Sequence, residues 1–98
     1  NLGDFTEKDI VNQPSILDEF PNLNIMAVKV EKGSEILGKS LKEIQLRNRT
    51  GVTLLALRRN DDIIEHPNPD FIFELDDVAY ILGTPEQENL AFELFSGS

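Results

Sequence analysis

The fold is decided by residues 37–59, LGKSLKEIQLRNRTGVTLLALRR, where a short helical pattern passes directly into the pattern of a buried strand. Ser40 and Glu43 have the spacing of a capping box, in which an N-cap hydroxyl is followed by a carboxylate three residues later. Gly51 is expected to end the helix. The run 52–57 is short, apolar and β-prone, and polar residues follow it. This stretch therefore predicts a short helix followed by a buried strand.

The flanking sequence extends this pattern in both directions. Alternating apolar and polar residues predict a half-buried strand at 24–31. After residue 59 we expect a brief strand at 63–64, an ordered proline-containing loop at 66–70, and strands at 71–75 and 78–82. Thr84, Pro85 and Gln87 indicate the start of a final helix. Its predicted inward stripe is Leu90, Ala91, Leu94 and Phe95. The order β-α-β-β-β-β-α predicts an α+β fold.

The chain divides into two predicted segments, 1–22 and 23–98. The first is acidic, contains Pro14 and Pro21, and reads as a linker or helical arm. Its apolar residues recur at nearly helical spacing: Phe5, Ile10, Val11, Ile16, Leu17 and Phe20. Too few to form a core alone, they are expected to pack on another surface of this chain, a second copy or a further domain. A frayed chain end is the alternative.

Composition limits the class of protein. Ninety-eight residues suffice for one domain, and 40% hydrophobic with 28% charged residues is typical of soluble globular chains. No apolar run is long enough to span a bilayer, and the start resembles no signal peptide. The missing initiator methionine suggests a piece of a longer chain, and the absence of cysteine permits a cytosolic location. A net charge of −9 should repel nucleic-acid phosphates, so we expect no nucleic-acid partner.

The sequence offers little for catalysis, so we expect no enzyme activity and no catalytic residues. The single histidine, His66, lacks the spaced partners of a metal site, and we favour an ordinary loop residue over a metal ligand. The pairs Asp61-Asp62 and Asp76-Asp77 fit turn chemistry better than acid–base catalysis. No glycine-rich phosphate motif is present, and no cofactor is expected.

Six basic residues cluster in one region of this acidic chain. They are Lys39, Lys42, Arg47, Arg49, Arg58 and Arg59. Guanidinium groups could hold a phosphate, or they could simply solvate the ends of a helix and a strand. From the residue pattern alone, we favour solvation.

The order and spacing of several short motifs resemble the TrkA-C (RCK-C) family over about residues 24–95. These motifs are LGKSLKEI (37–44), GVT (51–53), ALRR (56–59), PNPD (67–70), LDDV (75–78) and LGTPE (82–86). The arginine pair, the Asn-Pro-Asp loop and the Leu-Gly-Thr-Pro-Glu ending are particularly similar to Kef-type potassium/proton antiporters. The resemblance implies a cytoplasmic domain of a bacterial inner-membrane transporter or channel. Such a domain would form a homodimer and bind a small ligand near the dimer cleft, thereby regulating transport of potassium or another monovalent cation.

In some family members the ligand is the nucleotide cyclic di-AMP. Carried onto matching positions, the resemblance implies a ligand site formed by Leu41, Leu46, Arg47, Thr53 and Pro69, with Arg49 and His66 as neighbours. Members that bind this ligand can carry asparagine where this chain has Thr53, and threonine offers fewer hydrogen-bonding groups.

The sequence leaves two other functions open. The chain could be a protein–protein interaction domain without a small ligand, in which the apolar arm docks a partner. An enzyme would rest only on His66 and the acidic pairs.

Overall fold

The computed structural model describes residues 19–97. Most of the predicted arm therefore lies outside the described residues. The elements are β1 (Asn24–Lys29), α2 (Leu41–Ile44), α3 (Leu46–Thr50), β2 (Thr53–Arg59), β3 (Asp62–Ile64), β4 (Val78–Gly83) and α4 (Pro85–Phe95). The α+β class is confirmed. Between residues 19 and 97, no helix is long and apolar enough to cross a membrane.

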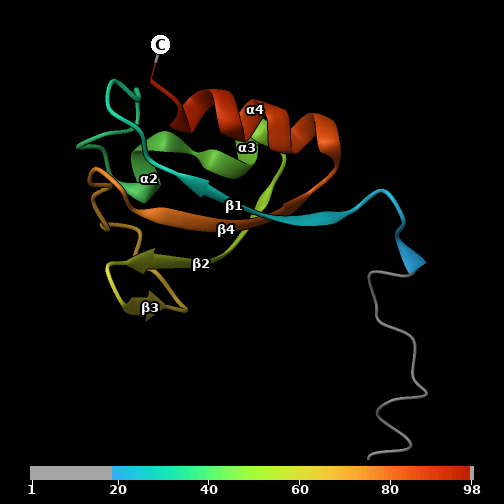
Figure 1. Cartoon of the computed structure of the whole chain (residues 1–98), viewed down its shortest axis with the longest axis horizontal. Coiled ribbons are helices and arrows are strands. Elements are labelled where there is room, and N and C mark those ends of the chain that lie inside the picture. Colours follow the sequence, from blue (N-terminus) through green and yellow to red (C-terminus); the bar gives the residue numbers. More distant parts are fainter. Residues whose placement is uncertain (1–18, 98) are drawn as a thin grey trace, which may run out of the picture.

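The four strands form one antiparallel sheet in the order β1-β4-β2-β3 (Figure 1). β4 lies between β1 and β2, with Ala27 opposite Tyr80 and Leu57 opposite Ala79. The register between β2 and β4 shifts at Leu55, which lies between the paired residues on either side. Such a bulge bends a strand and strengthens its twist. β2 therefore curves as it leaves the helices.

The helices cover one face of the sheet, and the core lies between the helices and the sheet. Along β4, Ala79 and Ile81 are buried toward this core, as the alternation of a half-buried strand requires. From α4, Ala91, Leu94 and Phe95 are buried as predicted. The predicted inward position of Leu90 is wrong, because this side chain is 49% exposed. The helical period places Glu88, one turn before Ala91, on the buried side and leaves Leu90 on the flank.

The predicted helix starts are confirmed. The Ser40 hydroxyl accepts a hydrogen bond from the Glu43 amide at 3.1 Å. At α4, Thr84 and Gln87 cap each other's backbone amides reciprocally, with Pro85 at the first position. The single predicted helix after Ser40 is instead two short helices, because Gln45 adopts the left-handed conformation (φ 45°) between α2 and α3.

The predicted strand at 71–75 is wrong. The Phe73 amide donates to the Lys39 carbonyl at 2.9 Å, and the Gly38 amide donates to the Phe73 carbonyl at 2.8 Å. This segment therefore pairs with the chain before α2 rather than with the sheet, which has four strands within residues 19–97 where five are predicted. Its predicted alternation survives, since Phe73 is fully buried and Ile72 is 45% exposed.

Candidate ligand-binding site

A pocket of about 540 Å³ opens beside the two short helices. Its walls come from α2, α3, the start of β2 and the chain after β3. The lining residues are Leu41, Gln45, Leu46, Arg47, Asn48, Val52, Thr53, Leu54, Glu65, His66 and Pro67. Small-molecule sites typically measure roughly 300–1,000 Å³ and combine apolar walls with a few polar groups. The pocket has the size and composition of such a site.

Most of the predicted ligand residues meet in this pocket. Leu41, Leu46, Arg47, Thr53 and His66 all line it. They come from three separate parts of the chain: the helix pair α2–α3, the first residue of β2 and the loop after β3. The pocket therefore depends on the tertiary fold rather than on one local motif.

Two predicted residues do not line the pocket. Arg49 forms an ion pair with Glu35 (2.9 Å) and lines a smaller depression of about 180 Å³ between α3 and α4. Pro69 instead supports the start of α2, because its carbonyl accepts a hydrogen bond from the Lys42 amide at 2.9 Å. Pro67, two residues earlier, supplies the proline wall of the pocket.

The chemistry of the pocket suits a flat, anionic molecule. Leu41, which is half-buried, presents aliphatic surface on which an aromatic ring can pack, whereas Leu46 also lines the pocket but is only 5% exposed. Arg47 supplies an exposed guanidinium, the group best shaped to bind phosphate oxygens through two parallel hydrogen bonds. The amides of Gln45 and Asn48 add donors and acceptors at the edge. Across residues 19–97, no three histidine, aspartate or glutamate side chains are grouped so as to hold a metal ion.

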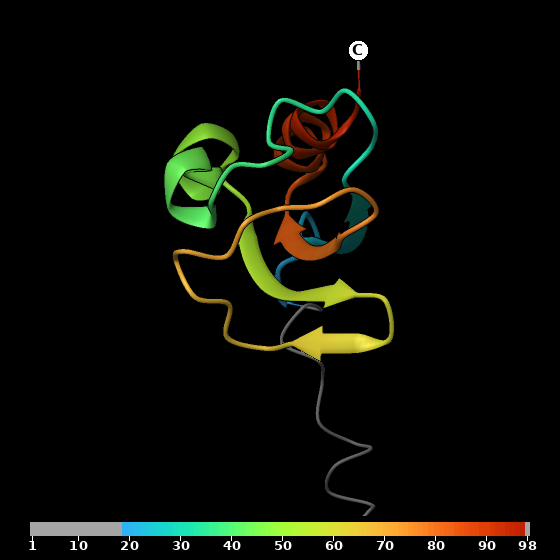
Figure 2. The ribbon, with the colours of Figure 1, turned by 90° about the vertical axis from the view of Figure 1, so that its left-hand side faces the viewer.

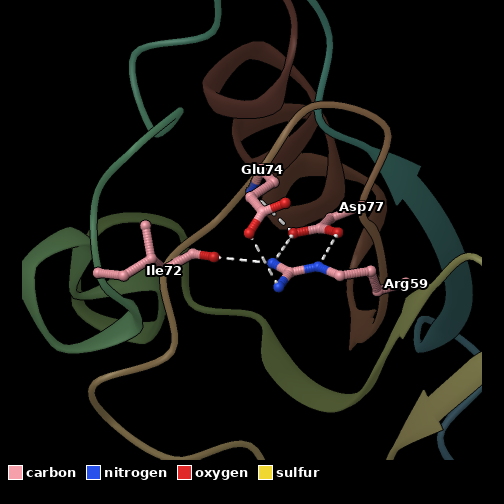
Figure 3. A network of polar contacts seen from close by, with 4 residues as sticks. All are labelled: Arg59, Ile72, Glu74 and Asp77. Atoms are coloured by element: carbon pink, nitrogen blue, oxygen red, sulfur yellow. Dashed lines mark hydrogen bonds and ion pairs between the residues drawn. The ribbon is translucent and has the colours of Figure 1, made fainter.

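At the end of β2 opposite Thr53, Arg59 forms a network that the sequence did not predict (Figure 3). Its Nε donates to Asp77 Oδ1 at 2.8 Å, and its Nη2 donates to Asp77 Oδ2 at 2.7 Å and to the Ile72 carbonyl at 2.8 Å. Nη1 lies 3.1 Å from Glu74 Oε2. The guanidinium carbon also lies 4.6 Å from the centre of the Phe71 ring, a cation–π geometry.

The Arg59 network is partly buried. The Asp77 side chain is only 2% exposed, whereas that of Arg59 is 31% exposed. The hydrogen bonds that Arg59 donates to Asp77 raise the pKa of Arg59, burial opposes this rise, and Coulombic attraction to Asp77 and Glu74 adds to it. The guanidinium therefore stays charged throughout the pH range in which proteins fold.

A sequence signal for this network existed. Adjacent strand residues face opposite sides of a sheet, so one member of the Arg58-Arg59 pair had to face the helices and loops. The expectation that both arginines are solvated is wrong for Arg59, whose guanidinium binds Asp77. The turn prediction for Asp77 is confirmed, because its carboxylate also accepts from the Glu74 amide at 2.8 Å.

The family model of the TrkA-C domain matches residues 25–96. The chain belongs to the TrkA-C family. The match spans every strand and helix of the structure except the first residue of β1, so it includes the pocket and the Arg59 network.

Several known proteins are similar to this TrkA-C domain. The chain is 38% identical over 76 residues to the Probable potassium channel protein 2 of Methanocaldococcus jannaschii, covering 76% of this chain and 22% of the channel protein. It is 30% identical over 94 residues to the K(+)/H(+) antiporter subunit KhtT of Bacillus subtilis, covering 90% of this chain and 57% of that subunit. The TrkA-C domain thus spans only part of the length of these relatives.

A solved structure shares the fold over nearly its whole length. The RCK_C domain dimer of S. agalactiae BusR, in complex with c-di-AMP, matches with a TM-score of 0.68 and 27% identity. The match covers 72% of this chain and 93% of that one. The recognised family and the α+β fold are therefore both confirmed.

The expectation of no nucleic-acid partner is wrong for this family. S. agalactiae BusR has also been solved in complex with its busAB-promoter DNA, and it matches this chain with a TM-score of 0.66 and 23% identity. The match covers 46% of that chain. A net charge of −9 describes one domain only. It cannot exclude DNA as a partner of a longer protein that carries such a domain.

Proposed function

We propose that this TrkA-C domain is a ligand-sensing and dimerising module that regulates transport of potassium or another monovalent cation. Its ligand is cyclic di-AMP, bound at the cleft between two copies. The observation that carries the proposal is the pocket, where Leu41, Leu46, Arg47, Thr53 and His66 come together. The names of the channel and antiporter relatives and the c-di-AMP complex of the BusR domain support it.

Each part of the pocket has a role in this proposal. Leu41 and Leu46 cover the face of an adenine, because aliphatic side chains remove a flat purine surface from water. Arg47 binds a phosphate of the cyclic backbone. Thr53 offers one hydroxyl to the adenine edge, which limits the hydrogen bonds available there. A second copy of the domain would receive the other half of this two-fold symmetric ligand.

Regulation follows from differential affinity. A ligand shifts a transporter between two states only by binding one arrangement of the dimer more tightly than the other. The domain would act on the cytoplasmic side of a bacterial inner-membrane transporter or channel portion, in the same or a partner chain. We assign it no catalytic step, because the pocket lacks a nucleophile paired with a base.

Thermal unfolding in the presence of nucleotides tests the proposal. Cyclic di-AMP should raise the melting temperature in a concentration-dependent manner, because a ligand that binds only the native state stabilises it by mass action. Arg47→Ala should weaken binding by about 1.5–3 kcal/mol through loss of a charged hydrogen bond. Arg49→Ala is the matched control, since Arg49 lies on the same helix but outside the pocket.

Cyclic di-GMP serves as the ligand control, with the same cyclic phosphate backbone but different bases. A shift with cyclic di-AMP alone that Arg47→Ala reduces and Arg49→Ala preserves supports the proposal. Equal shifts in both variants, or no shift in the wild type, would contradict it.

A further inference from the structure

The chain between β3 and β4, residues 65–77, connects the pocket to the Arg59 network. At its beginning, Glu65, His66 and Pro67 line the pocket. At its end, Asp77 accepts two hydrogen bonds from Arg59. Figure 2 shows the gold first part of this segment on the same side as the green helices α2 and α3, and its orange last part crossing over toward β4. We call residues 65–77 the pocket loop.

The pocket loop also holds the start of α2. The Leu41 amide donates to the Phe71 carbonyl at 2.8 Å, and the Lys42 amide donates to the Pro69 carbonyl at 2.9 Å. These two amides belong to the first turn of a helix, where backbone donors have no partner within the helix. The loop satisfies them, so the position of Leu41 depends on the loop. Two walls of the pocket therefore depend on the pocket loop: Leu41 is held by it, and His66 and Pro67 belong to it.

The support of the pocket loop comes largely from one side chain. Within the loop, Arg59 contacts the Ile72 carbonyl, Glu74, Asp77 and the ring of Phe71. Figure 3 shows the carboxylates and the carbonyl converging on its guanidinium from different sides. Phe71 is also the residue whose carbonyl holds the Leu41 amide. A short path of direct contacts therefore runs from Arg59 through Phe71 to Leu41.

We propose that Arg59 is a positioning residue for the ligand pocket, which it does not line. Its guanidinium fixes the pocket loop against β2, and the loop in turn fixes Leu41 at one wall and His66 at the other. The ligand part of this inference rests on the proposed function. The effect on the loop does not, because every partner of Arg59 in the network is a residue of this chain. By thermodynamic linkage, a ligand that binds this arrangement of the walls more tightly also stabilises the Arg59 contacts.

The test uses His66 as its reporter. It is the only histidine in the chain, so its imidazole gives a unique NMR signal from the pocket loop. Arg59→Met should shift or broaden this signal and should speed hydrogen exchange at the amides of Leu41 and Lys42. Arg58→Met is the matched control, because the neighbouring strand residue faces away from the loop. It should leave the His66 signal and both exchange rates unchanged.

A double variant separates positioning from stability. Replacing a buried ion pair by apolar residues of similar volume is often neutral or stabilising. Arg59→Met/Asp77→Leu should therefore stay folded, yet retain the altered His66 signal and the faster exchange. Its affinity for cyclic di-AMP should fall about tenfold, a common size for coupling between sites. Arg59→Lys, which keeps the charge without the two-pronged geometry, should give intermediate values and provides a folded comparison if the double variant does not fold.

The outcomes are distinguishable. Unchanged His66 signals and amide exchange in the folded double variant or in Arg59→Lys would overturn the positioning role. A wild type that binds no cyclic di-AMP would overturn the proposed function, while the loop measurements would still decide the role of Arg59. A folded double variant with a loosened loop and undiminished affinity would overturn the link between loop and ligand.

Discussion

At the scale of single residues, the pair Arg59–Asp77 combines burial with complete hydrogen bonding. Asp77 is 2% exposed and accepts from two guanidinium nitrogens and the Glu74 amide. Burying a carboxylate is costly unless such partners replace the lost water. Removing the guanidinium would leave the buried carboxylate with the Glu74 amide but without its cationic partner.

We therefore expect Arg59→Ala to lower the free energy of unfolding by about 3 kcal/mol, the usual range for leaving one buried charge without its partner. Glu74→Ala removes an ion pair whose carboxylate side chain is 64% exposed, and should cost at most about 1 kcal/mol. Urea denaturation measures both. Similar losses in the two variants would show that burial of Asp77 does not govern the strength of the network.

The raised pKa of Arg59 predicts a difference between arginine and lysine at this position. A cation whose pKa is raised on folding contributes stability that is complete below its unfolded pKa and is lost as pH rises through the folded pKa. For Arg59 that loss lies above the range in which proteins are studied. In Arg59→Lys, the paired lysine has an unfolded pKa of about 10.4 and should lose its contribution above that value.

Unfolding free energies at pH 8 and pH 11 measure this difference. The gap in stability between wild type and Arg59→Lys should be wider at pH 11. A gap that stays constant would indicate that position 59 does not need its charge.

At the scale of helices and strands, two glycines with positive φ test how the helix ends are held. Gly38 (φ +81°) has free space around its α-carbon, whereas a methyl group added at Gly51 (φ +88°) would lie 2.7 Å from Gln87 Nε2. Gln87 belongs to the capping box of α4. A substitution at Gly51 therefore strains the backbone and also displaces a cap.

We expect Gly38→Ala to cost about 1–2 kcal/mol, the penalty of a left-handed conformation for an L-residue. Gly51→Ala should cost about 1 kcal/mol more, the typical value of an N-cap. Thermal denaturation, with the helical signal followed by circular dichroism, measures both variants. Equal losses would indicate that Gln87 moves aside without weakening α4.

Local sequence signals predicted the helix starts and most strands, but they did not predict with which segment each strand-like segment pairs. Capping pairs such as Thr84 with Gln87 act over three residues, so the sequence displays them directly. The segment 71–75 has strand-like alternation, yet its backbone partners lie at residues 38–41. Pairing over that separation is set by tertiary structure, which alternation alone cannot identify. Gln45 carries no sequence signal for its left-handed conformation.

At the scale of the whole molecule, the candidate site was predictable only through family resemblance. Leu41, Thr53 and His66 are distant in sequence, and nothing in their residue types shows that they share a pocket. The order of the motifs predicted that these residues act together, and in the structure Arg49 and Pro69 lie outside the pocket that the others line. Arg59 and Asp77 are 18 residues apart, so only the sheet and the loop together bring them into contact.

We propose that cyclic di-AMP bridges two copies of the domain through this pocket. Isothermal titration of the chain with this nucleotide gives both the affinity and the number of ligands per chain. We expect saturable binding of one ligand per two chains, weakened by Arg47→Ala and preserved in Arg49→Ala. Titration heats equal to ligand dilution, or one ligand per chain that is indifferent to Arg47, would contradict it.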